Sequence, residues 1–169
     1  MPVFIPEPRN LPELPPSPKV SIAITSYNYG SFLAECLDSC LAQTVRADEI
    51  VVVDDGSTDD TQRILQDYMA RFPSVIGIHQ VNRGIVGATN TALTNCTGDV
   101  VLLLDADDIL FPQRVEKVVR ALRETIDGHR PGWVHHYLLR FTREQPELGP
   151  VPRYADAARA FLDAYGPDP

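Results

Sequence analysis

Four short aliphatic runs alternate with segments of helical periodicity, and this alternation constrains the fold more than any other feature. The runs cover residues 20–25, 49–53, 75–81 and 100–104. Apolar residues recur three or four positions apart in the segments between and after them, at 31–41, 59–72, 84–95 and 112–126. Strands that alternate with helices of about ten to fifteen residues are typical of βαβ units. We therefore predict an α/β fold with a mostly parallel central sheet, covered by helices on both faces.

Residue types at the segment ends predict where three of the helices begin. Ser31 is expected to N-cap the first helix, whose buried face would then carry Phe32, Leu33, Cys36, Leu37, Cys40 and Leu41. Pro112 is expected in the first turn of the fourth helix, where a missing N–H costs nothing. Asp59 and Asp60 are expected to stabilise the N-terminus of the second helix rather than to bind a ligand.

The two ends of the chain differ in composition from its middle. Residues 1–18 contain seven of the fifteen prolines and predict an extended, poorly packed leader. Residues 19–141 form the predicted domain, with a fifth strand expected at 132–141. Residues 142–169 predict a proline-interrupted tail with a short helix.

Composition excludes several classes of function. A net charge of −8 disfavours a surface that follows nucleic-acid phosphates. No apolar run reaches the ~18–20 residues of a membrane span, and the N-terminus lacks the pattern of a secretory signal. Three cysteines do not make a disulfide framework, so we expect reduced, core-facing thiols. These features predict a cytoplasmic protein, either free or peripheral to the inner face of the membrane.

Polar residues follow each of the four predicted strands. These clusters are Thr25–Asn28, Asp54–Ser57, Asn82–Gly84 and Asp105–Asp108. In an open parallel sheet the ligand binds outside the carboxyl ends of the strands, so all four clusters should meet at one edge. The first three also have a structural interpretation, as turns and helix starts.

Asp105, Asp107 and Asp108 are harder to explain by structure alone. Two carboxylates about 4 Å apart repel by roughly 4 kcal/mol at an effective dielectric near 20. Such a group shares a proton, pairs with a cation or binds a metal, and the two lysines of the chain, Lys19 and Lys117, are distant in sequence. Mg²⁺ or Mn²⁺ fits best, held by one or two carboxylates and completed by substrate phosphates and water.

The ordered set of motifs resembles the family 2 glycosyltransferases. The motifs are VSIAITSYNYGSFLAECLDSCLAQT, EIVVVDDGSTDDT, NRGIVGATNTAL and GDVVLLLDADDIL, and the resemblance covers about residues 19–141. It implies a Rossmann-like GT-A fold that binds a nucleotide-diphospho-sugar, most often a UDP-sugar, with Mn²⁺ or Mg²⁺. It also implies inversion at the anomeric carbon and an acceptor whose nature the residues do not indicate.

The resemblance assigns roles to individual residues. Thr25 and Tyr27 would flank the nucleotide base, and Asp55 would hydrogen-bond it, while Asp54 would be structural. Asp105 and Asp107 match the two ends of the DxD motif, with Asp105 near the ribose or the metal and Asp107 on the metal. Asp108 would lie on the sugar side.

The third motif departs from the pattern of the family. Gly84 and Asn90 match its ends as donor-binding residues, but Thr89 stands where many relatives have arginine.

The acceptor side is the other departure. Relatives carry a carboxylate general base well downstream of DxD, and no residue of the tail, Glu144 and Glu147 included, is assigned that role. The alternative function is therefore a non-catalytic or incomplete nucleotide-sugar-binding fragment. Phosphoryl chemistry at the aspartates is disfavoured, because no lysine is suitably placed.

Overall fold

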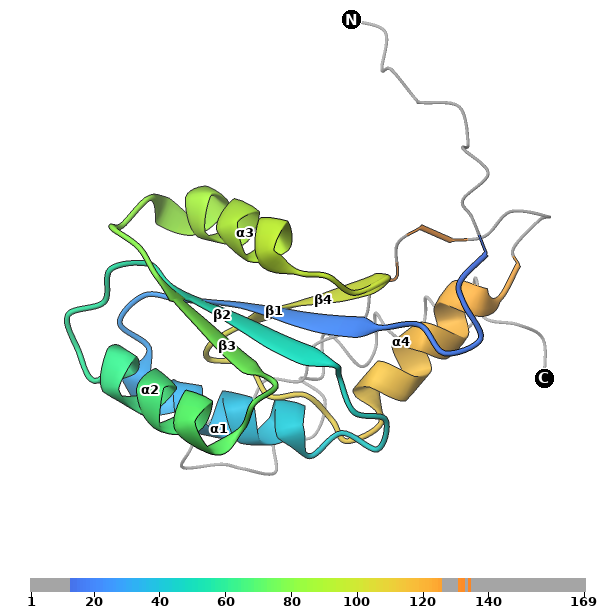
Figure 1. The fold of residues 1–169 in the computed structure, drawn as a ribbon, viewed down its shortest axis with the longest axis horizontal. Coiled ribbons are helices and arrows are strands. Elements are labelled where there is room, and N and C mark those ends of the chain that lie inside the picture. The colour runs from blue at the N-terminus through green and yellow to red at the C-terminus, as the bar shows by residue number, and fades with distance from the viewer. Residues whose placement is uncertain (1–12, 126–130, 133, 135–169) are drawn as a thin grey trace, which may run out of the picture. The chain divides into compact units, whose positions relative to one another are not determined.

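The computed structural model describes residues 13–125, 131, 132 and 134, in which strands and helices alternate strictly (Figure 1). The elements in chain order are β1 (Val20–Ser26), α1 (Gly30–Leu41), β2 (Glu49–Asp54), α2 (Thr61–Arg71), β3 (Val75–His79), α3 (Gly84–Asn95), β4 (Val100–Asp105) and α4 (Arg114–Arg123). The predicted βα rhythm is confirmed. The tail, and all of the predicted fifth strand except residues 132 and 134, lie outside the described residues.

The four strands form one parallel sheet in the order β3-β2-β1-β4. From β1 the chain moves outward through β2 to β3 and then returns to place β4 on the other side of β1. The strand order therefore reverses between β1 and β4, which makes this the topological switch point of the sheet. The register aligns Thr25 with Asp105 on one side and with Val53 on the other, so the polar strand ends are level.

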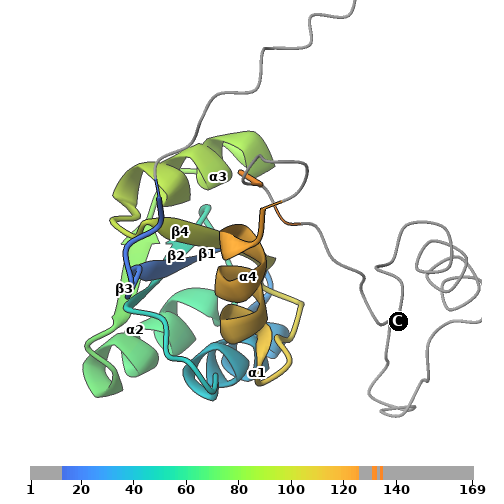
Figure 2. The ribbon, with the colours of Figure 1, turned by 90° about the vertical axis from the view of Figure 1, so that its right-hand side faces the viewer.

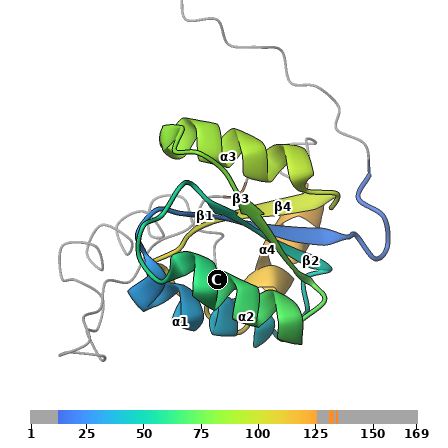
Figure 3. The ribbon, with the colours of Figure 1, turned by 60° about the vertical axis from the view of Figure 1, so that its left-hand side comes forward.

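Helices cover both faces of the sheet, as predicted. α3 lies on one face, while α1 and α2 lie on the other (Figures 1 and 3). Ala88 and Ala92 of α3 pack on Ala23 and Val53 in a small core. The larger core joins the opposite sides of β1, β2 and β4 to α1, α2 and α4. In Figure 2, α3 lies above the sheet, and α1, α2 and α4 lie below it.

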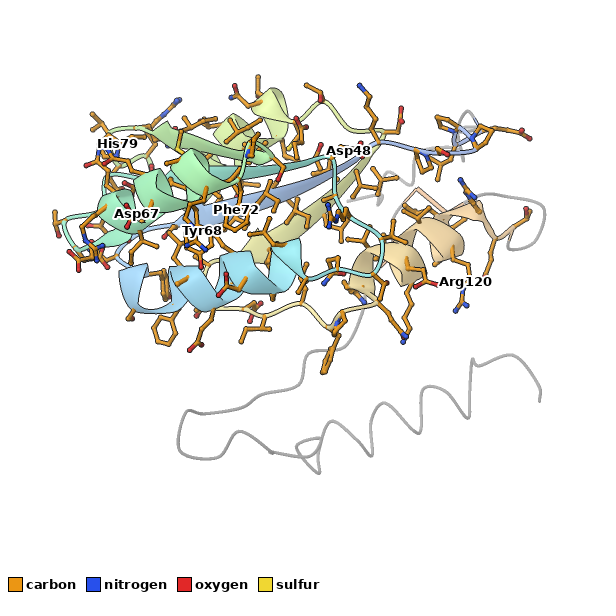
Figure 4. The ribbon with its side chains drawn as sticks, turned by 60° about the horizontal axis from the view of Figure 1, so that its bottom comes forward. Asp48, Asp67, Tyr68, Phe72, His79 and Arg120 are labelled. Carbon is orange, nitrogen blue, oxygen red and sulfur yellow. The ribbon has the colours of Figure 1, made fainter. Side chains whose placement is uncertain are left out.

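α1 and α2 are joined by a buried tyrosine. The Tyr68 hydroxyl shares its one hydrogen between Asp38 Oδ1 at 2.7 Å and the Ala34 carbonyl oxygen at 3.1 Å. Tyr68 and Phe72 lie on the side of α2 that faces inward (Figure 4). Burial and the charge of Asp38 raise the pKa of Tyr68 to about 12, so the hydroxyl stays a donor at neutral pH.

β4 departs from the expectation that the strands are covered on both faces. Its residues alternate between buried and exposed, with Val101 at 37% and Leu103 at 46% exposure. The reason is the placement of α3, which packs over β1 and β2. Within the described part of the chain, β4 also pairs with β1 alone.

Two predicted helix starts are wrong. α1 begins at Gly30 after Tyr29, so Ser31 is the second helical residue instead of the N-cap. α4 begins at Arg114, so Pro112 precedes the helix. In both places the preceding loop is held by contacts distant in sequence, which local residue types do not reveal.

Asp59 has the helix-start role that was predicted. Its Oδ1 accepts the Thr61 N–H at 3.0 Å, and its Oδ2 accepts the Gly30 N–H at 2.9 Å, so it supports the N-termini of both α2 and α1. Asp60 forms an exposed ion pair with Arg63.

Burial settles two further predictions. Phe32 is 38% exposed, so it does not belong to the buried face of α1. The three cysteines are free thiols, with Cys36 and Cys40 buried and Cys96 half-buried.

Leu14, from the predicted leader, packs against the larger core, and Arg123 donates to the carbonyls of Pro15 and Pro16.

Candidate functional site

A cavity of about 850 Å³ opens at the carboxyl ends of β1, β2 and β4. It lies at the switch point between β1 and β4, where a ligand is expected in a sheet of this kind. Its walls come from the β1–α1 loop, the end of β2, the start of α3 and the end of β4, through Thr25, Ser26, Tyr27, Asn28, Tyr29, Asp55, Asn82, Gly84, Ile85, Ala88, Asp105, Ala106 and Asp107.

The cavity brings together almost all the residues that the sequence singled out. Thr25, Tyr27, Asp55, Gly84, Asp105 and Asp107 all line it. Asn90 is exposed on α3 and does not line the cavity. Asn28 and Asn82 also line it and were not predicted as site residues, although both belong to polar clusters at strand ends. Nothing in the sequence marks Tyr29, Ile85 or Ala88.

The loop between β1 and α1 is fixed by a hydrogen-bonded asparagine. Asn28 adopts a left-handed backbone conformation with φ of 58°, which asparagine tolerates better than most residues. Its Oδ1 accepts the Thr58 N–H at 2.8 Å, and its own N–H donates to Ser57 Oγ at 2.9 Å. The contacts tie this loop to the one after β2 and hold Tyr27 and Tyr29 at the cavity, where their rings are 47% and 38% exposed.

Asp54 is a structural residue, as predicted. It is fully buried, accepts the Ser57 N–H at 2.9 Å and pairs with His79 Nδ1 at 2.8 Å. His79, labelled in Figure 4, is the last residue of β3, so this carboxylate joins two strand ends. Gly56 follows with φ of 76°, and a Cβ there would lie 2.9 Å from the Asn82 backbone nitrogen. The tight turn therefore requires glycine.

Asp55 is held in one orientation at the cavity wall. It is 3% exposed, and its Oδ1 accepts hydrogen bonds from Gln80 Nε2 at 2.6 Å and from the Arg83 N–H at 2.9 Å. Gln80 is itself fixed by the Thr91 hydroxyl, which donates to Gln80 Oε1 at 2.7 Å. No described residue donates to Asp55 Oδ2, so one carboxylate oxygen remains an acceptor for a ligand.

The aspartates after β4 have no such support. Asp105 and Asp107 are exposed, and within the described ranges no group donates a hydrogen bond to the side chains of Asp105, Asp107 or Asp108. Burial and the charges of Asp107 and Asp105 raise the pKa of Asp108. The described residues thus leave this negative charge uncompensated, as a cation site requires.

Asp105 and Asp107 fit a hard divalent cation. No group of three or more His, Cys, Asp or Glu side chains in the described residues is arranged to hold a metal. Two carboxylates at an open cavity instead match the way proteins bind Mg²⁺ with substrate phosphates, in which water and phosphate oxygens complete the shell.

The sequence model of glycosyl transferase family 2 matches residues 21–163. The chain belongs to glycosyl transferase family 2. This confirms the resemblance drawn from the four motifs, and the match covers the described elements from β1 to α4 except the first residue of β1.

Curated relatives of this family 2 glycosyltransferase are much longer than the chain. The chondroitin synthase of Escherichia coli is 44% identical over 109 residues, which are 64% of this chain and 16% of the relative. An uncharacterised glycosyltransferase of Nostoc sp. is 40% identical over 119 residues, which are 70% of this chain and 36% of the relative. The chain therefore spans about a sixth to a third of the length of these relatives.

Solved structures of glycosyltransferases share the fold. The mannosyltransferase PcManGT of Pyrobaculum calidifontis, in complex with GDP-Man and Mn²⁺, has a TM-score of 0.56 and 31% identity, over 69% of this chain and 35% of its own. TarS 1–349 of S. aureus has a TM-score of 0.57 and 29% identity, over 62% of this chain and 32% of its own. The Rossmann-like GT-A fold that was predicted is confirmed.

None of the described helices combines the length and the apolar composition needed to cross a bilayer.

Proposed function

We propose that this chain is the donor-binding part of a glycosyltransferase that uses a nucleotide-diphospho-sugar with Mn²⁺ or Mg²⁺. The observation that carries the proposal is one cavity that contains two different acidic groups. Asp55 is oriented and keeps one oxygen for a ligand, while Asp105 and Asp107 have no hydrogen-bond donor among the described residues. A nucleotide diphosphate with its cation needs both kinds of group.

Asp55 is proposed to select the base. Its free Oδ2 accepts a hydrogen bond, so it favours a base with an imino N–H, such as uracil, and we propose a UDP-sugar as donor. Thr25 and Tyr27, which line the same cavity, would lie against the base. The exposed Tyr27 ring offers a flat apolar surface for stacking.

Asp105 and Asp107 would hold the cation. When bound, a divalent cation neutralises the charge that develops on the leaving diphosphate. The chain itself adds the N-terminus of α3, whose first residues Gly84 and Ile85 line the cavity. The Gly84 N–H already donates to Asn82 Oδ1 at 3.2 Å. The helix N-terminus still favours phosphate oxygens, which assists an anionic ligand in a protein of net charge −8.

Transfer also needs a base that deprotonates the acceptor hydroxyl, and inversion at the anomeric carbon is proposed on the resemblance to the family. No described residue is assigned this role. The alternative function, an incomplete donor-binding fragment, is supported by the short span of the chain along its relatives.

Calorimetric titration with UDP tests the proposal, in Mn²⁺ and again in EDTA. We expect clearly tighter binding in Mn²⁺, and equal affinity in both would contradict the role of the cation. Incubation with UDP-sugars and GDP-sugars, Mn²⁺ and simple acceptors separates the two functions. A missing general base typically lowers a rate about 10²–10⁴-fold, so robust multiple-turnover transfer would rule out the fragment.

A further inference from the structure

One side of α1 and the residues just after it hold the chain that follows β4. We call residues 105–113 the acidic loop. Five hydrogen bonds join the end of α1 to the loop and the start of α4, and they involve Ser39, Gln43 and Thr44. We propose that Ser39 and Gln43 are positioning residues that set the acidic loop for cation binding. The inference rests on the proposed function of the cavity.

Gln43 has the most contacts of this group. It is 5% exposed and lies two residues beyond the end of α1. Its Nε2 donates to the Phe111 carbonyl at 2.9 Å and to the Ser39 carbonyl at 3.0 Å, and its Oε1 accepts the Val115 N–H at 3.0 Å. One amide therefore satisfies the end of α1, the acidic loop and the first turn of α4, where no local side chain provides a cap.

Ser39 holds the acidic loop nearer to the aspartates. Its Oγ donates to the Cys36 carbonyl at 2.7 Å and accepts the Leu110 N–H at 3.0 Å. Cys36 lies one turn earlier, with Sγ 3.7 Å from the Asp105 carbonyl oxygen. These contacts, with the Thr44 N–H on the Pro112 carbonyl at 2.7 Å, run along the loop from its first residue to its end.

Between its two fixed ends, the acidic loop has a short segment whose residues are exposed or half-buried. Ala106 and Leu110 are buried at 1% and 8% exposure, so only Asp107, Asp108 and Ile109 lie between two anchors. Repulsion between neighbouring carboxylates favours their separation. Anchors that resist this separation keep the carboxylates close enough to share one cation, because a preorganised site loses less on binding.

The test compares Ser39→Ala and Gln43→Leu with matched controls. Thr94→Ala removes a hydroxyl that donates within α3, to the Asn90 carbonyl at 2.7 Å. Gln62→Leu makes the same change as Gln43→Leu at an exposed position of α2. Ser39→Thr keeps the hydroxyl and should behave like the parent chain.

The measured quantity is the ratio of the UDP dissociation constant in EDTA to that in Mn²⁺. We expect the ratio to fall about tenfold in Ser39→Ala and Gln43→Leu, as for other residues that orient metal ligands, and to stay unchanged in the three other variants. Thermal unfolding of each variant shows whether it is folded, and the milder Ser39→Ala covers the case in which Gln43→Leu does not fold.

Two results would overturn the inference. One is a folded Ser39→Ala variant with the ratio of the parent chain. The other is an equal loss of affinity in Mn²⁺ and in EDTA, which would show a general structural role. Failure of the proposed function is distinguishable, because the parent chain itself would then show no effect of Mn²⁺, and the inference would fall with it.

Discussion

The side chains of Asp54 and Asp55, at the end of β2, accept hydrogen bonds from the fold, and the two residues are at most 3% exposed. Asp105 and Asp107, at the end of β4, are instead exposed, and their side chains accept no hydrogen bond from the described residues. Both pairs follow aliphatic strands and look alike in sequence. The two pairs differ in burial and in the hydrogen-bond donors around their side chains. The first pair helps to build the site, and the second has a charge that no described residue compensates.

This difference teaches how carboxylates can be sorted by their partners. A buried carboxylate with several donors contributes to stability and to geometry. A group of exposed carboxylates without donors costs some repulsion and persists where function needs it. The two pairs should therefore respond to substitution in opposite ways, one in folding and the other in binding.

The largest expected effect is on folding, from Asp54→Ala. The change removes the acceptor of the Ser57 N–H and the partner of His79 at a fully buried position. We expect the free energy of unfolding to fall by about 3 kcal/mol, since each hydrogen bond to a charged group contributes roughly 1.5–3 kcal/mol. Urea denaturation measures it. Asp107→Ala, the matched change in the other pair, should stay within about 0.5 kcal/mol of the parent chain. Similar losses in both variants would break the comparison.

The next effect is on binding, from Asp107→Asn. The substitution keeps the size of the side chain and removes its charge, so UDP affinity in Mn²⁺ should fall at least about tenfold, or 1.4 kcal/mol. Affinity in EDTA should not change. Asp67→Asn is the control, because Asp67 is an exposed residue of α2 that pairs with Arg63 and lies away from the cavity (Figure 4). A loss of affinity that is independent of Mn²⁺ would remove Asp107 from the cation site.

A smaller effect is expected from Asp55→Asn. The variant can keep an oxygen toward Gln80 and the Arg83 N–H, but it places an amide donor where Oδ2 accepts. UDP affinity should fall about fivefold, which corresponds to the net contribution of one hydrogen bond. The loss should be the same in Mn²⁺ and in EDTA, unlike that of Asp107→Asn. If UDP affinity fell only in Mn²⁺, Asp55 would lie near the cation, and the two acidic pairs would belong to a single cation site.

Much of the fold could be predicted, because its determinants are local. Aliphatic runs, helical periodicity and polar strand ends each occupy a few consecutive residues, and the helix 84–95 has the bounds that were predicted. The same holds for Asp55, Asp105 and Asp107, whose position after a strand is enough to bring them to one edge.

What could not be predicted depends on contacts distant in sequence. Residues 101 and 103 of β4 are as apolar as their neighbours, yet they are exposed because α3 lies over β1 and β2. Gln43 looks like an ordinary polar residue after a helix, and its role follows from carbonyl and N–H groups almost seventy residues away or more. No periodicity or motif marks such a residue.

The smallest predicted effect concerns pH, and it contrasts Asp108 with Asp59. Burial and the charges of Asp107 and Asp105 raise the pKa of Asp108 above its ordinary value of 3.8. The folded chain then holds this proton more tightly than the unfolded chain, so the contribution to stability is present below 3.8 and is lost as the pH rises through the raised pKa. Burial also raises the pKa of Asp59, but hydrogen bonds from Thr61 and Gly30 outweigh it, and the net shift is downward. Its contribution is present above 3.8 and is lost as the pH falls.

Asp108→Asn and Asp59→Asn should therefore change stability in opposite directions at pH 7. Asp108→Asn removes a charge that opposes folding and should raise the free energy of unfolding by a few tenths of a kcal/mol, because solvent screens a half-exposed group. Asp59→Asn should lower it, since the amide can replace only one of the two accepting oxygens. Urea denaturation at pH 7 and at about pH 3 measures both, and the gain from Asp108→Asn should vanish in acid, where the parent carboxyl is protonated. If Asp108→Asn were instead destabilising at pH 7, Asp108 would have a stabilising partner in the folded chain. The charge after β4 would then be partly compensated without a cation, and the contrast between the two acidic pairs would weaken.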